Sequence, residues 1–334
     1  MNRTRDVIVV GASAGGVEAL SGFVGSLPKD LAATVLVVLH IPAHAPSKLD
    51  SILQRFTSLQ VLPAEDGAAL RHGVIYVSKS DRHLMVGDGV VRLTRGPKEC
   101  RMRPAVDVLF RSAAMELGPR AIGVVLSGAL DDGTAGLWAI KDRGGIALVQ
   151  EPTSAEYSSM PDAAIAHVDV DFVAPVQALA QHAARLVGAA VSMNAQQPQS
   201  GERHGVENLI AMEGNGLQAG VMNLGKVSKY TCPDCHGVLV QIEEGAIVRF
   251  RCHTGHAFSL QTLLAEVNEA IDTGLWDTLR AIEERVMLLK QTADLYGKEG
   301  MTAAADRCTK QAQETELRLK PIRELVLDPG FFGH

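Results

Sequence analysis

The sequence predicts an α/β fold: a mainly parallel, doubly wound sheet with helices on both faces, followed by a smaller module of different character. The first observation is that short apolar runs alternate with amphipathic helical patterns from residue 6 to about residue 190. That alternation is typical of strands and helices wound into a parallel sheet. The second observation is a compact segment rich in Cys and His at 230–258, and the third is a pair of long helical patterns after it.

The expected strands are short runs rich in Val, Ile and Leu, which suit strands buried on both faces. They cover 7–10, 34–39, 73–77, 84–86, 90–93, 121–126 and 145–149, with 171–173 as an edge. Helical patterns between them cover 15–26, 46–55, 104–117, 134–142, 160–166 and 175–191. The runs at 74–77, 84–86 and 90–93, with the turn Gly87-Asp88-Gly89, indicate a small antiparallel excursion.

Changes in composition divide the chain into four parts: a first domain at 1–191, a linker at 192–229, the Cys/His segment at 230–258 and a helical hairpin at 259–334. The linker is indicated by Gln196–Gly201 and by the glycines after it, with a short amphipathic piece at 205–213. The hairpin consists of helical runs at about 259–297 and 301–326, broken between them by two glycines.

Composition limits the classes of function. The 334 residues are 46% hydrophobic and 21% charged, as in ordinary globular proteins, and the net charge of −6 argues against a broad nucleic-acid surface. No apolar run is long enough for a signal peptide or a membrane span, so we expect neither secretion nor membrane insertion. Five cysteines, three of them at metal-ligand spacing, favour a reducing cytoplasm over a disulfide framework.

Ser13 lies on the turn between the first strand and the first helix. The motif Gly11-x-Ser13-x-Gly15 matches the nucleophile elbow, in which a serine projects from the sheet edge beside helix amides that stabilise an oxyanion. Such glycine-rich turns also bind phosphates or dinucleotides. Here, however, Ser13 replaces the second glycine of the dinucleotide motif, and the next strand ends in His40 instead of an acidic residue. We therefore favour a nucleophilic serine.

His40 and Asp132 each follow another predicted strand, so we expect them at the same carboxyl edge of the sheet as Ser13. A nucleophile, a base and an orienting carboxylate could converge there. Position alone leaves alternatives open. His44 competes with His40 for the role of base, Asp131 competes with Asp132, and either aspartate could instead cap the 134–142 helix.

A second candidate site is formed by a Cys-x2-Cys pair and, after a gap of 16 residues, a Cys-x3-His pair: Cys232, Cys235, Cys252 and His256. This spacing is typical of a tetrahedral structural zinc held between β-hairpins. Thiolates and imidazole suit Zn²⁺, and four protein ligands leave no open position for catalysis. His253 is an alternative to His256 as the fourth ligand.

Six segments of the first domain, in chain order, carry a family resemblance. They are Gly11–Gly16, His40–Pro42, Ala64–Gly67, Arg103–Phe110, Gly128–Gly133 and Met160–Pro161. Over about residues 6–190 they resemble the catalytic domain of the chemotaxis protein-glutamate methylesterases, the CheB family. The resemblance implies that Ser13 is the nucleophile, His40 the general base and Asp132 the residue that orients the imidazole.

The implied reaction is hydrolysis of γ-glutamyl methyl esters on a chemoreceptor or a similar helical signalling protein. Glutamine deamidation is an implied side activity, and no catalytic cofactor is implied. Amides near Ala14–Gly16, with one from the 128–130 turn, would hold the oxyanion. A methyltransferase or kinase of the same pathway is a further implied partner. The setting Gly255–Ser259 resembles an extension of some stand-alone family members, which favours His256 over His253.

The sequence departs from the family pattern in three places. Family members in chemotaxis usually carry an N-terminal receiver domain, and because the first strand begins at residue 7 we expect that gate to be absent. We expect the C-terminal module to supply regulation or targeting instead. The family often has Thr at the position of Ala14, and Met-Gly-Asn where this chain has Ala129-Leu130-Asp131. The smaller Ala129 changes one wall of the pocket, so the substrate is less well defined than the triad.

Other functions compete with the esterase. A non-enzymatic signalling scaffold would keep the fold without needing all three triad residues, which are present here. A hydrolase of another ester or amide would use the same three residues. A zinc-ribbon protein that binds nucleic acid is disfavoured by the acidic charge balance.

Overall fold

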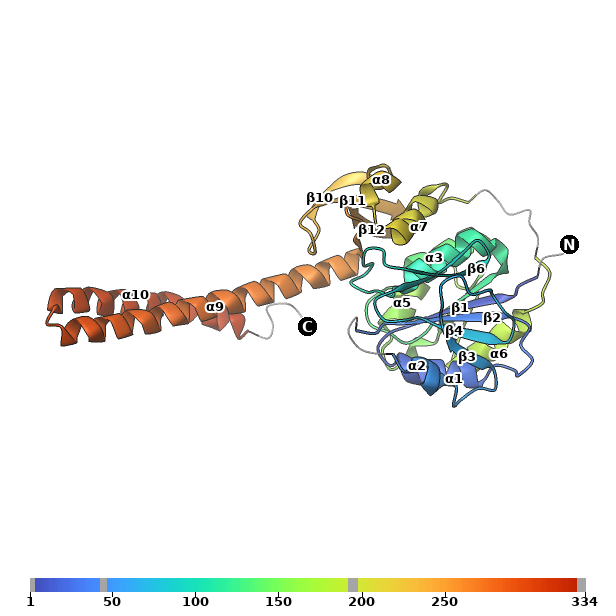
Figure 1. The fold of residues 1–334 in the computed structure, drawn as a ribbon, viewed down its shortest axis with the longest axis horizontal. Coiled ribbons are helices and arrows are strands. Elements are labelled where there is room, and N and C mark those ends of the chain that lie inside the picture. The colour runs from blue at the N-terminus through green and yellow to red at the C-terminus, as the bar shows by residue number, and fades with distance from the viewer. Residues whose placement is uncertain (1–3, 43–46, 192–197, 329–334) are drawn as a thin grey trace. The chain divides into compact units, whose positions relative to one another are not determined.

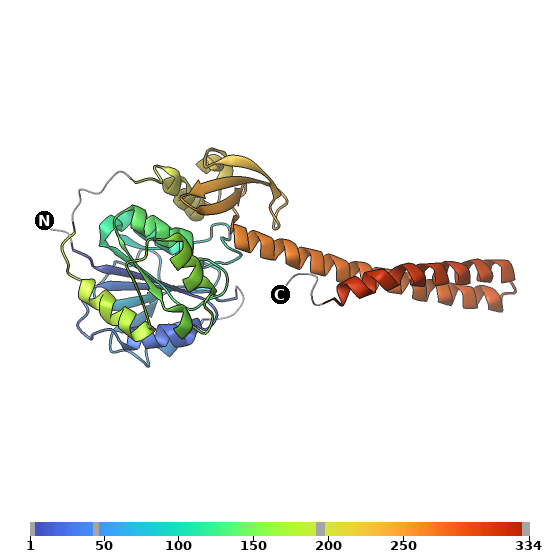
Figure 2. The same cartoon turned by 180° about the vertical axis from the view of Figure 1, so that it is seen from behind.

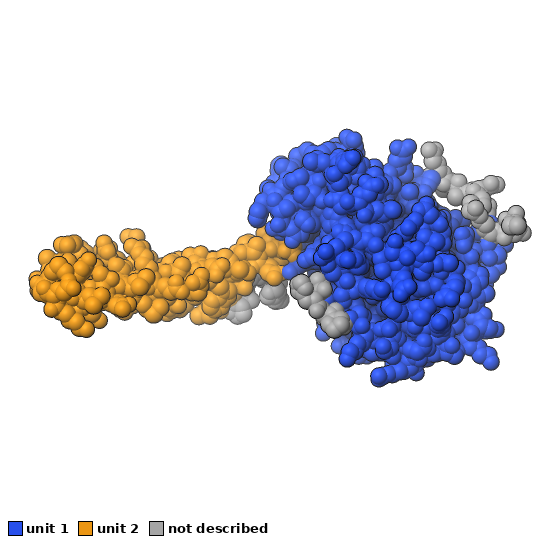
Figure 3. All heavy atoms as spheres, viewed as in Figure 1, with its two compact units in different colours: residues 1–262 blue, residues 263–334 orange. Residues whose placement is uncertain are grey.

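The computed structural model describes residues 4–42, 47–191 and 198–328. It divides into two compact units, residues 1–262 and residues 263–334 (Figures 1 and 3). The first unit contains the predicted α/β domain and the Cys/His segment. The second contains most of the C-terminal helical pair.

A seven-stranded sheet in which all neighbouring strands are parallel forms the centre of the first unit, which confirms the predicted fold class. Its strand order is β3-β4-β2-β1-β7-β8-β9. The strands are β1 (Val7–Ala12), β2 (Thr34–Leu39), β3 (Gln60–Pro63), β4 (Val74–Val77), β7 (Ala121–Val125), β8 (Ile146–Gln150) and β9 (Phe172–Ala174). Every residue of β1 and β2 is buried, which explains their unbroken apolar runs.

Helices cover both faces of this sheet (Figures 1 and 2). Ile8 and Val10 of β1 belong to the core on one face, whereas Val7 and Val9 belong to the core on the other, as the alternation of strand side chains requires. The first core includes side chains from α1 (Gly16–Gly25), α2 (Leu49–Leu53) and α6 (Val176–Leu186). The second includes side chains from α3 (Val106–Leu117), α4 (Thr134–Asp142) and α5 (Ser159–His167). Short 3-10 turns lie at Gly118–Arg120 and Pro152–Ser154.

Two features of the sheet differ from the prediction. The sequence does not predict β3, because this edge strand buries only Val61 and has no apolar run to reveal it. The run at 74–77 is not part of the antiparallel excursion, since β4 pairs in parallel with β2 and β3. Only β5 (His83–Gly87) and β6 (Val90–Thr94) form an antiparallel hairpin. Its turn residues Asp88 and Gly89 have positive φ values, 52° and 72°, as a tight hairpin turn requires.

The segment 192–229 is predicted as a linker, and the structure differs where it is described. Residues 192–197 lie outside the described residues. Further on, α7 (Arg203–Glu213) confirms the amphipathic piece expected at 205–213, and α8 (Gly216–Ala219) and a 3-10 turn at Val221–Asn223 follow it. Ala211 of α7 packs in one cluster with Met85 and Val108 of the first domain. The glycines misled the prediction because they end helices here: Gly214, for example, adopts the left-handed conformation (φ 72°) that follows α7.

The Cys/His segment folds as a four-stranded antiparallel sheet. Its strands, in spatial and chain order, are β10 (Lys226–Thr231), β11 (Val238–Glu244), β12 (Ile247–Cys252) and β13 (Ala257–Ser259). β10 is almost wholly exposed, whereas β12 is mostly buried. The sheet is therefore exposed at its β10 edge and buried at β12 and β13.

The second unit is a pair of helices, α9 (Leu260–Lys298), whose first three residues belong to the first unit, and α10 (Thr302–Val326). The helices run antiparallel, since Glu283 of α9 pairs with Arg323 of α10 and Lys290 pairs with Glu316. In the part of the chain that the structure describes, no helix combines the length and apolar character needed to cross a bilayer.

Candidate active site

Ser13, His40 and Asp132 lie just beyond the carboxyl ends of β1, β2 and β7, which are neighbours in the sheet. Strand β1 has β2 on one side and β7 on the other, so the chain connections leave it in opposite directions at this point. Crevices at such a switch point are where open parallel sheets place their functional groups. The structure thus brings the three predicted residues to one edge.

The His40 imidazole joins the other two side chains. Its Nδ1 lies 2.9 Å from Ser13 Oγ, and its Nε2 lies 2.7 Å from Asp132 Oδ2. The ring nitrogens are exchanged relative to the chymotrypsin-type triad, in which Nε2 faces the serine. Either nitrogen can accept a proton while the other donates, so the chemistry is retained. The side chains of His40 and Asp132 are only 9% and 2% exposed, whereas Ser13 is half-buried.

The Asp132 carboxylate is held by the beginning of α3. It accepts hydrogen bonds from the backbone N–H of Val106 (2.7 Å) and Asp107 (2.9 Å) in addition to the His40 contact. These are N-terminal amides of a helix, which favour negative charge. The carboxylate therefore has a fixed orientation and keeps one oxygen directed at the imidazole.

Asp107 makes the reciprocal contact, and the sequence analysis did not identify it. Its Oδ1 accepts from the N–H groups of Gly133 (3.0 Å) and Gly136 (2.6 Å) at the beginning of α4. Burial, with the neighbouring Asp132 carboxylate, raises the pKa of Asp107 well above its usual range. An acidic residue in the first turn of a helix is common, so the sequence carried no signal for this second role.

The turn around Ser13 depends on two glycines. Gly15 has a left-handed backbone (φ 68°), and a Cβ atom there would lie 2.8 Å from Ser127 Oγ. A Cβ atom on Gly128 would lie 2.0 Å from Met160 Sδ and 2.9 Å from Ser13 Cβ. The backbone at each position lies too close to neighbouring side chains to leave room for a Cβ atom, so the turn that places Ser13 requires glycine at both.

The geometry separates the candidates that position alone left open. Asp132, and not Asp131, contacts the imidazole. The Asp131 carboxylate instead accepts a hydrogen bond from Ser259 Oγ (2.6 Å). Burial raises the pKa of Asp131 to about 6, with Asp132 adding to the effect and the Ser259 hydroxyl opposing it. His44 lies outside the described residues.

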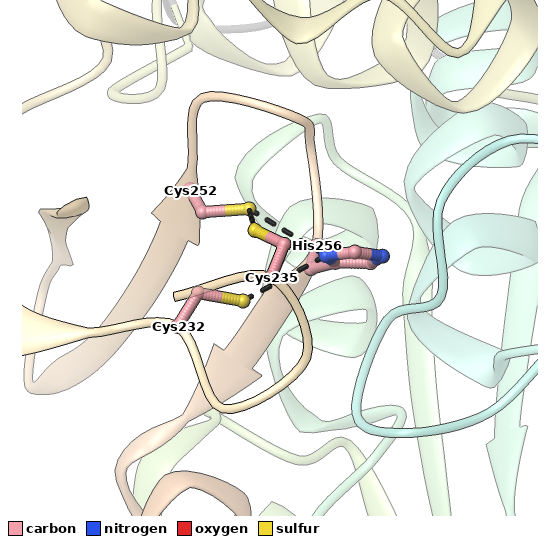
Figure 4. A group of neighbouring side chains, drawn as sticks. All are labelled: Cys232, Cys235, Cys252 and His256. Carbon is pink, nitrogen blue, oxygen red and sulfur yellow. Dashed lines mark hydrogen bonds between the residues drawn. The ribbon is translucent and has the colours of Figure 1, made fainter. Parts of the chain in front are cut away.

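The second candidate site also assembles (Figure 4). The ligand atoms of Cys232, Cys235, Cys252 and His256 all lie within 4.8 Å of one another. Cys235 Sγ and Cys252 Sγ are 3.6 Å apart, and His256 Nδ1 lies 3.7 Å from the thiols of Cys232 and Cys252. Zn–S bonds of about 2.3 Å in a tetrahedron separate ligand atoms by roughly 3.7 Å, so the spacing suits Zn²⁺.

His253, the alternative fourth ligand, is not in this cluster. Its ring lies against Gly237, where a Cβ atom would be 2.2 Å from its Cε1. Two other buried groups of potential ligands occur in the described chain: Cys100 with Asp107 and Asp132, and His204 with Glu207 and Glu244. The second group is already paired with cations, because Arg249 binds both of its glutamates and Arg251 also binds Glu207. Neither group has the soft, tetrahedral donor set of the cysteine cluster.

A parallel α/β sheet in which serine, histidine and aspartate meet at adjacent strand ends has the arrangement of a serine hydrolase. The comparisons agree and are more specific. The model of the CheB methylesterase family matches residues 8–183. This chain belongs to the CheB methylesterase family.

Known relatives cover the first domain. A protein from Methanosarcina mazei named protein-glutamate methylesterase/protein-glutamine glutaminase 2 is 35% identical over 191 residues, or 55% of this chain and 52% of the relative. A Leptospira interrogans relative is 34% identical over 54% of this chain and 94% of its own length. The crystal structure of the Thermotoga maritima CheB methylesterase catalytic domain matches with a TM-score of 0.53 and 30% identity, covering 55% of this chain and 100% of that domain. The chain thus spans about half the length of the Methanosarcina relative.

Proposed function

We propose that this protein is a protein-glutamate methylesterase that uses Ser13, His40 and Asp132 as its catalytic triad. The observation that carries the proposal is the continuous hydrogen-bonded path from Ser13 Oγ through the His40 ring to Asp132. The family and the names of its relatives support the substrate class.

The triad geometry suits acyl transfer. Ser13 Oγ would attack the ester carbonyl carbon while His40 Nδ1 takes the hydroxyl proton. Asp132 would stabilise the resulting imidazolium through Nε2. His40 would then return the proton to the leaving oxygen, so that methanol departs and the glutamyl group stays on Ser13. Water, activated by the same imidazole, would attack the acyl-enzyme and release the glutamate and the Ser13 hydroxyl.

The amides of Ala14 and Gly15 are our candidates for the oxyanion hole. They precede α1, where N–H groups at a helix beginning favour developing negative charge. Two other amides that the sequence suggested are engaged elsewhere: the N–H of Gly16 donates to the Ser13 carbonyl and that of Gly128 donates to Tyr157. Of the amides that the sequence suggested, those of Ala14 and Gly15 remain, together with those of Ala129 and Leu130 in the second turn.

The substrate we propose is a methylated glutamate on the helical cytoplasmic region of a chemoreceptor or a similar signalling protein. A glutamine amide at the same position would form the same acyl-enzyme and release ammonia, so deamidation is the expected side activity. A methyltransferase or kinase of the same pathway is the further proposed partner. We place the protein in the cytoplasm, because a reducing compartment keeps thiols out of disulfides. None of the five cysteines, all of them within the described residues, forms a disulfide, and three of them lie in the cluster proposed to bind a metal.

Methanol release from a methylated receptor cytoplasmic fragment tests the proposal. Wild-type protein should release methanol, and Ser13→Ala should release none above background. Ser26→Ala is the matched control, because the Ser26 hydroxyl only caps the end of α1. If the wild type releases nothing, labelling by a fluorophosphonate distinguishes the alternatives. Labelling that requires Ser13 would indicate a hydrolase of another ester or amide, and no labelling would indicate a non-enzymatic scaffold.

We also propose that the cysteine cluster holds one structural Zn²⁺, bound by Cys232, Cys235, Cys252 and His256. The ion would join the turn between β10 and β11, which carries Cys232 and Cys235, to the end of β12 and the turn before β13, which carry Cys252 and His256. Protein prepared with zinc should contain one ion per chain by elemental analysis. Cys232→Ser and His256→Ala should lose it. His253→Ala and Cys308→Ser should retain it, since these side chains lie outside the cluster.

A further inference from the structure

The β10–β13 sheet is attached to the first domain by buried ion pairs. The Arg251 guanidinium of β12 lies 2.8 Å from Glu99 and 2.8 Å from Glu207, and Glu99 in turn binds Arg111 of α3. All four side chains are at most 2% exposed. Buried charges of this kind are tolerated only when they are closely paired, so they fix the sheet in one position on the domain.

The turn that carries two of the proposed zinc ligands touches the first domain directly. Gly255 lies between Cys252 and His256 and has a left-handed backbone (φ 102°). A Cβ atom there would lie 2.7 Å from Pro97 Cγ and 2.7 Å from Ile210 Cγ2, so there is no room for a side chain. The Gly255 carbonyl also accepts from Arg251 Nη1 (2.9 Å). The conformation of the metal-binding turn and its contact with the domain are therefore linked.

Strand β13 continues this contact toward the triad. Ala257 directly follows His256; its N–H donates to the Lys98 carbonyl (3.2 Å), and its carbonyl accepts from the Cys100 N–H (2.8 Å). On its other edge β13 pairs with β12. The Cys100 thiol belongs to the compact buried group that contains the Asp107 and Asp132 carboxylates. The strand thus connects a zinc ligand to the surroundings of the catalytic aspartate.

Ser259 makes the closest contact with the catalytic loop. It lies three residues after His256, and its hydroxyl donates to Asp131 Oδ1 (2.6 Å). Asp131 immediately precedes Asp132, and Leu130 before it has a left-handed backbone (φ 62°) that is unfavourable for a residue with a side chain. A loop with such a residue needs contacts from outside to keep its conformation.

We infer that zinc binding to the cysteine cluster controls esterase activity by fixing β13, and that Ser259 is a positioning residue that holds the Asp131–Asp132 loop against His40. The inference rests on the proposed function, because it needs both the triad and the zinc site. It assigns a direct structural effect on catalysis to residues 198–262, which contain α7, α8 and the β10–β13 sheet and are called the extension below.

Loss of zinc would affect the triad in two steps. Loss of zinc frees His256 and the turn before β13, which weakens the pairing of Ala257 with 98–100 and the bond from Ser259 to Asp131. The loop then samples other conformations, in which Asp132 no longer orients the imidazole. Orientation of the base matters mainly in the transition state, so kcat should fall while KM stays nearly constant.

Three variants test the role of Ser259 by steady-state kinetics on the methylated receptor fragment. Ser259→Ala removes the hydroxyl and should lower kcat about three- to tenfold with KM within about twofold, the range for loss of one hydrogen bond. Ser259→Thr retains a hydroxyl and should restore kcat. Thr262→Ala is the matched control: it removes the contacts of the Thr262 hydroxyl with the Ser259 amide and hydroxyl at the same beginning of α9, but it keeps the Ser259 hydroxyl that donates to Asp131. Equal losses in Ser259→Ala and Thr262→Ala, or no loss in Ser259→Ala, would overturn the inference.

Amide hydrogen exchange tests the effect of zinc independently of activity. Removal of zinc from the full chain by a chelator should speed exchange at least tenfold in peptides covering 98–107 and 128–133. A peptide covering β2 should not change, since this strand belongs to the other sheet and pairs with β1 and β4. Unchanged exchange in the first two peptides, or a protein that takes up no zinc, would contradict the inference.

The two measurements also separate failure of the inference from failure of the proposed function. A wild-type protein without esterase activity and without Ser13 labelling would refute the esterase, while the exchange experiment would still decide whether zinc orders the loop. In an active enzyme, zinc removal should lower kcat in the wild type and have a smaller additional effect in Ser259→Ala, because both changes remove the same contact.

Discussion

The first unit contains two groups of buried or partly buried carboxylates that are held in different ways. Asp107, Asp131 and Asp132 lie at the carboxyl edge of the sheet and are held mainly by backbone amides and hydroxyls. Glu99 and Glu207 lie where the extension meets the first domain and are held by arginine guanidinium groups. Burial raises the pKa of Asp107 and Asp131, whereas the arginines lower the pKa of Glu99, against the effect of burial, to about 2.

The difference corresponds to two tasks. A carboxylate that must stabilise a transient imidazolium cannot already be paired with a permanent cation, so amides, which only orient it, are the suitable partners. A carboxylate that fixes an interface has no such restriction, and a bidentate arginine gives it both direction and strength. The carboxylates at the catalytic edge thus remain able to stabilise the positive charge that develops on His40. The carboxylates at the interface are paired permanently and keep the two surfaces in one position.

The largest expected effect comes from changing a carboxylate at the catalytic edge. The Val106 and Asp107 amides donate to different oxygens of Asp132, so Asp132→Asn, with one acceptor oxygen, can bond only one of them. It also cannot hold the His40 tautomer or stabilise its positive charge. We expect kcat for methanol release to fall by a factor on the order of 10⁴ with little change in KM, and the free energy of unfolding to fall by about 1–3 kcal/mol.

Asp171→Asn is the matched control for this change. Asp171 also accepts a backbone N–H, that of Ala147, but it lies at the other end of the sheet, before β9. Its variant should keep the wild-type kcat. A loss of less than tenfold in Asp132→Asn would mean that the two groups of carboxylates do not differ in task.

The second effect comes from removing a cation at the interface. Arg251→Met leaves Glu99 and Glu207 with one arginine fewer in a buried setting, and breaking such a pair typically costs about 3–5 kcal/mol. We expect the extension to separate from the first domain at lower urea concentration. Trp138 reports this step, because its ring packs edge-on against His204 of α7 with centroids 6.0 Å apart. In a Trp276→Phe background, its emission should shift to longer wavelength in an early, separate transition.

An exposed ion pair supplies the control. Arg280 of α9 is 63% exposed and pairs with Glu284 at 3.0 Å. Surface pairs of this kind contribute little, so Arg280→Met should leave the Trp138 transition where it is. If both variants behave alike, the buried arginines do not fix the interface.

The sequence predicts a site residue well when that residue lies close, along the chain, to the strand or motif that positions it. Ser13 and His40 could be located because each directly follows a buried apolar strand, and parallel strands bring their carboxyl ends together. Asp132 follows its strand through a longer turn, so position alone could not distinguish it from Asp131, and the family pattern was needed. The cysteine cluster was predictable from local spacing.

The contacts of the extension could not be predicted in the same way. Glu99, Arg111, Glu207 and Arg251 are separated by up to 152 residues, and isolated charged residues read as surface positions. The bond from Ser259 to Asp131 spans 128 residues and uses a serine whose ordinary role is to cap a helix. Nothing in residue type or spacing marks such pairs. These pairs can be recognised only in the folded structure, where the extension contacts the first domain.

The smallest effect per residue is expected from lowering the pH. The resulting change in folding stability has opposite signs in the two groups of carboxylates. Glu99, and Glu244, which shares Arg249 with Glu207, have folded pKa values of about 2, below the ordinary value of 4.5. Their stabilisation is fully present above pH 4.5 and is lost as the pH falls toward 2, on the order of 3 kcal/mol each. Asp131 has a folded pKa of about 6, above the ordinary 3.8, so protonation between these values favours the folded state.

Protection factors from hydrogen exchange between pH 6 and 3 distinguish the two responses. Peptides from α7 and β12 should lose protection below pH 4.5, together with a red shift of Trp138 emission. The 128–133 peptide should keep its protection from pH 6 to pH 4.5 and lose it only after the interface has opened. Loss of protection at 128–133 in the upper range, before any change in α7, would reverse the assignment, since the catalytic edge would then be the acid-sensitive region. The expected order instead makes the arginine-paired interface the weak point in acid, even though it is the more strongly paired region at neutral pH.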